Sequence, residues 1–118
     1  MINHFKIVLF VYDFPHRKTI DFINILSNSN FKISLVLAAK FVKIDSPKSA
    51  FHIHHKEIRT EPKELSKKYK IPYYVVQHNS EETKNLLIEY DINFGVIAGA
   101  RILKKSIIDL IKFGVLNF

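Results

Sequence analysis

The sequence predicts an α/β fold, a Rossmann-like parallel sheet with helices on both faces. Short apolar runs rich in β-branched and aromatic residues recur along the chain, and such runs are typical of strands buried on both faces. Segments with helical apolar spacing separate these runs, so that strands and helices alternate. The 118 residues, 47% of them hydrophobic, are enough for one core, and we expect residues 1–118 to form a single domain.

The first half of the chain predicts two strands and one helix. Phe5–Tyr12 is a near-continuous apolar run and is the first expected strand. Asp13 follows it as a helix cap, and the helix ends near Asn28. Phe31–Ala38 is the second expected strand. Ala39–Thr60 shows no convincing period, which favours a long loop with at most one short helix.

The second half predicts three helices, beginning with a short one over Glu64–Tyr69. Asn79 caps the next helix, because Glu82 follows it at the spacing of a capping box, and this helix runs to about Tyr90. The last helix is indicated by the spacing of Leu103, Ile107, Leu110 and Ile111, with Gly114 as its stop. The three remaining strands are expected over Tyr73–Gln77, Asn93–Ala98 and Val115–Phe118.

Composition excludes several classes of protein. The chain has no cysteine, so disulfide scaffolds, Cys-ligated zinc and thiol catalysis are excluded. No apolar run approaches the roughly 20 residues of a membrane span, and the N-terminus lacks the cleavage site of a signal peptide. We therefore expect a cytoplasmic protein without a membrane partner.

The net charge of +7 invites a nucleic-acid interpretation. Nine of the eighteen Lys and Arg residues lie in Lys40–Lys70, together with four of the eleven acidic residues. Such a basic segment can attract RNA or an anionic substrate, or it can be a solvated face. His52, His54 and His55 lie in the same segment, but no acidic side chain supports them at ligand spacing. A solvated loop is therefore favoured over a metal site.

In a doubly wound sheet, ligands bind beyond the carboxyl ends of the strands, where the strand order reverses. With the common order 3-2-1-4-5, that crevice lies between the loops after the first and fourth strands. The first loop, from Tyr12 to Pro15, contains no glycine, and neither a Gly-X-Gly-X-X-Gly motif nor a P-loop occurs in the chain. Nicotinamide dehydrogenases and P-loop nucleotide hydrolases are therefore excluded.

Two segments resemble the N-terminal domain of the folate-dependent formyltransferases, a family that includes phosphoribosylglycinamide, methionyl-tRNA and sugar N-formyltransferases. They are Gly95–Leu103 (Gly-Val-Ile-Ala-Gly-Ala-Arg-Ile-Leu) and Gly114–Phe118 (Gly-Val-Leu-Asn-Phe). Ile71-Pro72 before the third strand also looks like this family. The resemblance implies transfer of a formyl group from 10-formyltetrahydrofolate, as co-substrate, to an amine.

The resemblance also implies roles for particular residues. Arg101, Ile102 and Leu103 would hold the pterin of the folate, whereas the alternative is that Ile102 and Leu103 begin the core face of the next helix. Asn117 matches the family's catalytic Asn, whose amide would stabilise the developing oxyanion. The purine-pathway branch of the family has a Gly-rich first loop that binds its substrate phosphate. The first loop of this chain lacks glycine, which favours a sugar-nucleotide amine or an aminoacyl-tRNA as acceptor.

The family's catalytic His would come directly after Phe118, where the sequence stops, and its catalytic Asp would come later still. The expectation is a truncated folate-binding portion that has little transferase activity alone and self-associates through its fifth strand, at the edge of the sheet. The alternative function is a non-catalytic, nucleotide- or RNA-binding Rossmann-like module.

Overall fold

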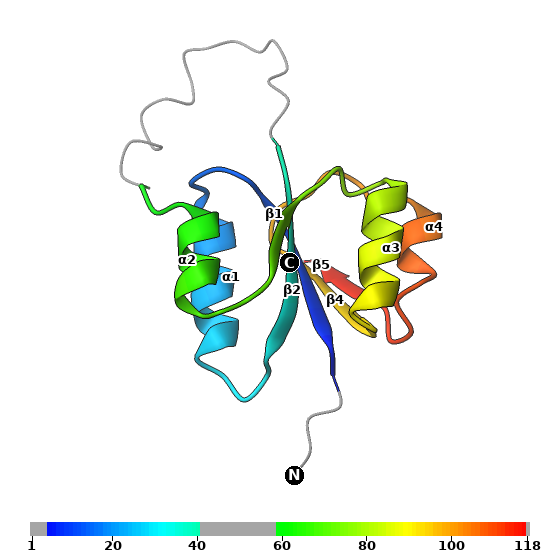
Figure 1. Ribbon diagram of the computed structural model, residues 1–118, viewed down its shortest axis with the longest axis horizontal. Helices are drawn as coiled ribbons and strands as arrows, with labels where there is room; N and C mark the ends of the chain where they lie inside the picture. The colour runs from blue at the N-terminus through cyan, green and yellow to red at the C-terminus, as the bar shows by residue number, and fades with distance from the viewer. Residues whose placement is uncertain (1–4, 41–58, 118) are drawn as a thin grey trace.

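The computed structural model describes residues 5–40 and 59–117. Its centre is a five-stranded, wholly parallel sheet in the order β3-β2-β1-β4-β5 (Figure 1). The strands are β1 (Ile7–Tyr12), β2 (Ile33–Ala39), β3 (Tyr73–Val75), β4 (Phe94–Ile97) and β5 (Val115–Asn117). The predicted fold class and strand order are confirmed.

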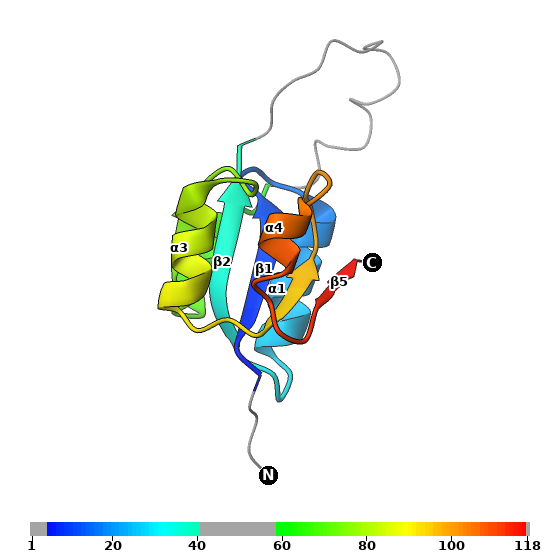
Figure 2. The ribbon, with the colours of Figure 1, turned by 90° about the vertical axis from the view of Figure 1, so that its right-hand side faces the viewer.

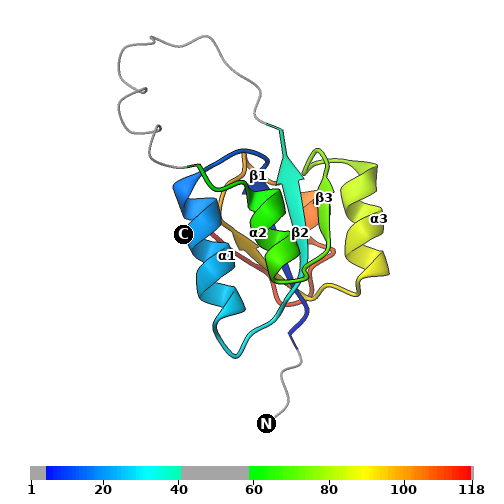
Figure 3. The same cartoon turned by 60° about the vertical axis from the view of Figure 1, so that its left-hand side comes forward.

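Helices cover both faces of the sheet, as parallel strands require. α1 (Arg17–Ser27) and α2 (Pro62–Lys68) lie together on one face, whereas α3 (Glu81–Glu89) and α4 (Lys105–Ile108) lie on the other (Figures 1 and 3). Each face has its own buried cluster. Ile7, Leu9 and Val11 point toward α1, and the alternate residues Val8 and Phe10 point toward α3 and α4.

Both helix caps predicted from local sequence are wrong. α1 is capped by His16, whose Nδ1 accepts the Thr19 N–H at 3.3 Å. Asp13 instead accepts the Tyr73 hydroxyl at 2.6 Å. α3 is capped by Ser80, and the neighbouring Asn79 bonds to the loop after β4. In both cases the side chain predicted as the cap, Asp13 or Asn79, instead forms a hydrogen bond with a residue distant in sequence.

The end of the chain differs in extent from the prediction. α4 is a single turn, because the backbone beyond Ile108 continues as turns up to Gly114, where φ is +92°. Leu103, Ile107 and Ile111 are nevertheless buried against the sheet. β5 pairs only with β4 and lies at the edge of the described sheet (Figure 2). Of the expected loop Ala39–Thr60, residues 41–58 with the three histidines lie outside the described residues.

Candidate functional site

The carboxyl ends of the strands form one edge of the sheet, and the strand order reverses between β1 and β4. Tyr12 ends β1 and Ile97 ends β4, so the loops that follow these strands border the reversal point. This is the position at which open α/β sheets bind ligands. The sequence predicted this edge correctly.

Aromatic rings occupy the loop after β1. Tyr12 and Phe14 stack with their centroids 5.2 Å apart, and His16 meets the two rings edge-on at 5.4 and 5.7 Å. Gly99, two residues after β4, lies against Tyr12, because a Cβ atom at Gly99 would be 2.7 Å from the Tyr12 ring. The aromatic cluster of Tyr12, Phe14 and His16 thus packs against the loop after β4.

A polar cavity of about 230 Å³ opens beside this cluster, at the ends of four strands. The side chains around it carry two positive charges and several amide or ring donors: Tyr12, Ala39, Lys40, Gln77, His78, Asn79 and Arg101. The ion pairs within residues 5–40 and 59–117 are Lys6–Asp91, Lys84–Glu81 and Lys105–Asp109. Within these two ranges neither Lys40 nor Arg101 therefore has a carboxylate partner, and none of the described residues that line the cavity is acidic.

His78 forms the inner wall of the cavity and is only 5% exposed. Its Nε2 lies 2.9 Å from the Leu37 carbonyl oxygen, to which it donates, and its ring meets Phe10 edge-on at 5.1 Å. Burial lowers the pKa of His78, and the carbonyls of Leu37 and Val11 oppose that effect only in part. At neutral pH the ring is uncharged, so it adds polarity but no charge.

Asn79 connects the cavity to the loop after β4. Its Nδ2 donates to the Ile102 carbonyl at 3.0 Å, and its Oδ1 accepts the Lys104 N–H at 2.7 Å. The two bonds fix the backbone of this loop from both sides. The sequence offered a signal for Asn79 in its position directly after a strand, but that signal was interpreted as a helix cap.

The predicted folate-binding residues lie in one loop but in three environments. Arg101 lines the polar cavity. Ile102 is 91% exposed, whereas Leu103 is buried in the core with Ile107. The Ile102 carbonyl accepts the bond from Asn79. The other peptide groups of Ile102 and Leu103 form no backbone hydrogen bond with a described residue.

Asn117, the predicted catalytic residue, ends β5 directly beside Ile97 of β4. Its side chain is exposed. The structure therefore places Asn117 at the carboxyl end of β5 and the loop containing Arg101 after the carboxyl end of the neighbouring β4. Tyr73 is the first residue of β3, and its hydroxyl donates to Asp13 in the loop after β1. Burial, followed by the Asp13 carboxylate, raises the pKa of the Tyr73 phenol.

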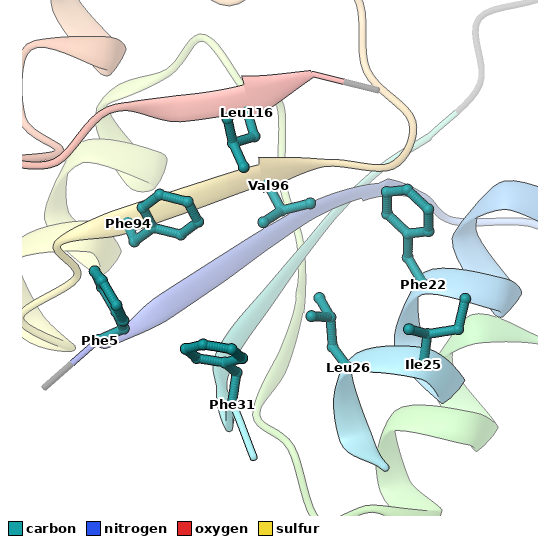
Figure 4. Close-up of a pocket in the computed structure, with 8 residues that line it drawn as sticks. All are labelled: Phe5, Phe22, Ile25, Leu26, Phe31, Phe94, Val96 and Leu116. Atoms are coloured by element: carbon teal, nitrogen blue, oxygen red, sulfur yellow. The ribbon is translucent and has the colours of Figure 1, made fainter. Parts of the chain in front are cut away.

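A second cavity, of about 480 Å³, is entirely apolar and lies between α1 and the sheet (Figure 4). The residues that line this apolar groove come from α1, β4, β5 and the segments before β1 and β2: Phe5, Phe22, Ile25, Leu26, Phe31, Phe94, Val96 and Leu116. Phe94, Val96 and Leu116 place the groove on the face of β4 and β5 opposite to α3 and α4. Among the described residues no helix is long and apolar enough to cross a membrane, and no group of three metal-ligating side chains occurs.

Comparison with solved structures confirms the predicted resemblance at the level of the fold. Phosphoribosylglycinamide formyltransferase from Anaplasma phagocytophilum matches 98% of this chain with a TM-score of 0.63 and 17% identity. The enzymes from Bacillus halodurans and Streptococcus pneumoniae each match 95%, with TM-scores of 0.59 and 0.53 and identities of 17% and 16%. The chain spans 49%, 55% and 54% of these three structures, respectively, or about half their length. No family model and no curated protein sequence matches it.

Proposed function

We propose that residues 1–118 are the folate-binding part of an enzyme that transfers a formyl group from 10-formyltetrahydrofolate to an amine. The observation that carries the proposal is the fold shared with three formyltransferases over at least 95% of the chain. The Arg101–Leu103 loop and Asn117 add to it, because the loop follows the carboxyl end of β4 and Asn117 is the last residue of the adjacent β5. The agreement of fold and motif supports formyl transfer more than either alone.

The loop of Arg101, Ile102 and Leu103 suits a flat amphipathic ring such as a pterin. Such a ring needs an apolar contact and convergent backbone donors and acceptors. Ile102 supplies an exposed apolar side chain, and the peptide N–H groups of Ile102 and Leu103 make no bonds within the described chain. Asn79 holds the loop in place, so little ordering is required when a ring binds.

Asn117 would act on the formyl group in this proposal. The lone pair of a neutral amine attacks the formyl carbon, a carbon–nitrogen bond forms, and the carbonyl oxygen becomes an oxyanion. The Asn117 amide N–H donates to that oxygen. Collapse of the tetrahedral intermediate breaks the bond to the folate nitrogen, which takes up a proton while the amine loses one. Removal of one such donor costs roughly 10²–10³ in rate.

Two acceptor classes fit the loop after β1. The aromatic cluster of Tyr12, Phe14 and His16 replaces the Gly-rich loop expected for glycinamide ribonucleotide, so the proposed acceptor is a sugar-nucleotide amine or an aminoacyl-tRNA. The basic residues between Lys40 and Lys70 are compatible with either, because both acceptors carry negatively charged phosphate groups.

Titration with folinic acid, a stable formyltetrahydrofolate, tests the folate site. The charge introduced by Ile102→Asp is expected to weaken binding at least tenfold, whereas Ile88→Asp on α3 is the matched control, since Ile88 is 66% exposed and distant in sequence from the loop. Leu103→Asp is unsuitable because Leu103 is 6% exposed and the variant would unfold. Equal affinities for the two variants would remove the loop from the site.

The second candidate function is RNA binding without catalysis, favoured by the net charge of +7. Binding through phosphate contacts weakens steeply with salt. An RNA affinity that falls steeply between about 50 and 200 mM salt, in a chain that does not bind folinic acid, would favour this function over formyl transfer.

Self-association through β5 belongs to the same proposal. An edge strand presents unpaired backbone groups, and Leu116 on β5 is 47% exposed beside the apolar groove. Light scattering at increasing concentration is expected to show a dimer of the chain, and Leu116→Lys is expected to shift it to the monomer. A monomer at all concentrations would contradict this part of the proposal.

A further inference from the structure

The polar cavity shares Arg101 with the proposed folate loop, but its other lining residues, among them Lys40, Gln77 and His78, have no role in the folate and Asn117 arrangement described above. The described residues that line it include two cations, Lys40 and Arg101, and no carboxylate. Asp13, the acidic residue next to Tyr12, is engaged by the Tyr73 hydroxyl. Within the described part of the chain, an anion in the cavity would therefore meet two cations and no competing carboxylate.

The size of the cavity restricts the anion. Pockets for whole small-molecule ligands measure roughly 300–1,000 Å³, and this one measures about 230 Å³. It has room for a phosphoryl or diphosphoryl group but not for a nucleoside as well. Two cations from separate segments, together with the amide groups of Gln77 and Asn79, suit the several oxygens and multiple charge of phosphate better than a single carboxylate.

The packing around Tyr12 explains why such a site would lie here and not in the loop after β1. A phosphate cradle in that loop needs backbone amides that approach the ligand closely, and the stacked rings of Tyr12 and Phe14 occupy the loop instead. The same Tyr12 forms one wall of the polar cavity. The opening at this edge is thereby displaced toward the ends of β2 and β3.

We propose that the cavity between Lys40, Arg101 and His78 is a phosphate-binding subsite for the diphosphate of the formyl acceptor. The diphosphate points to a sugar-nucleotide amine as acceptor, and this part of the inference rests on the proposed formyl transfer. The binding of an inorganic anion does not depend on that function. The phosphate subsite can therefore be tested without folate or an acceptor.

Calorimetric titration of the full chain with inorganic pyrophosphate is the test. Lys40→Gln and Arg101→Gln are each expected to weaken binding about tenfold to hundredfold, the range for charged hydrogen bonds. Lys104→Gln is the matched control, because Lys104 is an exposed cation near Arg101 that lines a different cavity, and it is expected to change the affinity less than twofold.

Three results would overturn the phosphate subsite: no binding of pyrophosphate by the unmodified chain at millimolar concentration, equal loss in all three variants, or equally tight binding of glutamate. The second result would indicate diffuse attraction by surface charge. The third would indicate a carboxylate site. If pyrophosphate binds as expected but folinic acid does not, the subsite stands and the formyl-transfer proposal fails.

Discussion

Gly99→Ala tests the packing that closes the loop after β1. A Cβ atom at this position would be 2.7 Å from Cδ2 and 3.1 Å from Cε2 of Tyr12. Carbon atoms in contact normally lie about 3.5–4.0 Å apart, so the Tyr12 ring must retreat by about 1 Å. It cannot do so without disturbing its contacts with Phe14 and His16.

The expected cost is about 2 kcal/mol in the free energy of unfolding. Insertion of a methyl group into a packed site costs about 1–3 kcal/mol, and a disturbed aromatic pair forfeits roughly 0.5–1.5 kcal/mol. The φ angle of Gly99 lies outside the left-handed region, so the alanine introduces no backbone strain. The effect is therefore steric, and urea unfolding measures it.

A double-mutant cycle with Tyr12→Ala separates this clash from other causes. With the ring removed, Gly99→Ala is expected to be neutral or slightly stabilising, by about 0.5 kcal/mol, because it reduces the entropy of the unfolded chain. Gly114→Ala is the control. Its φ of +92° with nothing within 4 Å predicts a loss of about 1 kcal/mol with or without Tyr12. The same loss for Gly99→Ala in both backgrounds would refute the packing argument.

Three further outcomes follow from the carboxyl edge. Burial lowers the pKa of His78, so the unfolded chain binds its proton more tightly. The free energy of unfolding is therefore highest above pH ~6.5 and falls as the pH is lowered. In urea unfolding, the free energy of unfolding of His78→Gln is expected to change less with pH than that of the unmodified chain. Tyr73→Phe removes the donor to Asp13 and is expected to cost about 1.5 kcal/mol in the same assay; an unchanged midpoint would contradict this. Asn79→Ala is expected to weaken the binding of both folinic acid and pyrophosphate in the titrations above. Weaker binding of only one ligand would contradict a shared role of Asn79 in both sites.

The alternation of strands and helices was predictable because it depends on features that span whole segments, and the strand order followed from the order common to doubly wound sheets. Buried parallel strands leave continuous apolar runs such as Ile7–Tyr12, and the helices between them leave helical spacing. The caps were not predictable. Asp13 and Asn79 each satisfy the local rule for a cap, and a contact from a distant segment decides against both. Tyr73 is sixty residues from Asp13, and Ile102 is twenty-three residues from Asn79, so no local window contains the competing partner.

The same long-range contact gives the candidate site its form. If Asn79 capped α3, the loop after β4 would lose the two bonds that hold Ile102 and Lys104. Because Ser80 performs the capping, Asn79 is free to face the polar cavity and to hold the loop at once. A phosphate bound near Arg101 and a pterin ring bound on Ile102 would then both contact the same loop after β4, whose backbone Asn79 holds in place. The orientation of an acceptor relative to the formyl donor would thus depend on the Asn79 side chain, which touches neither the reacting carbon nor the amine in the proposed reaction.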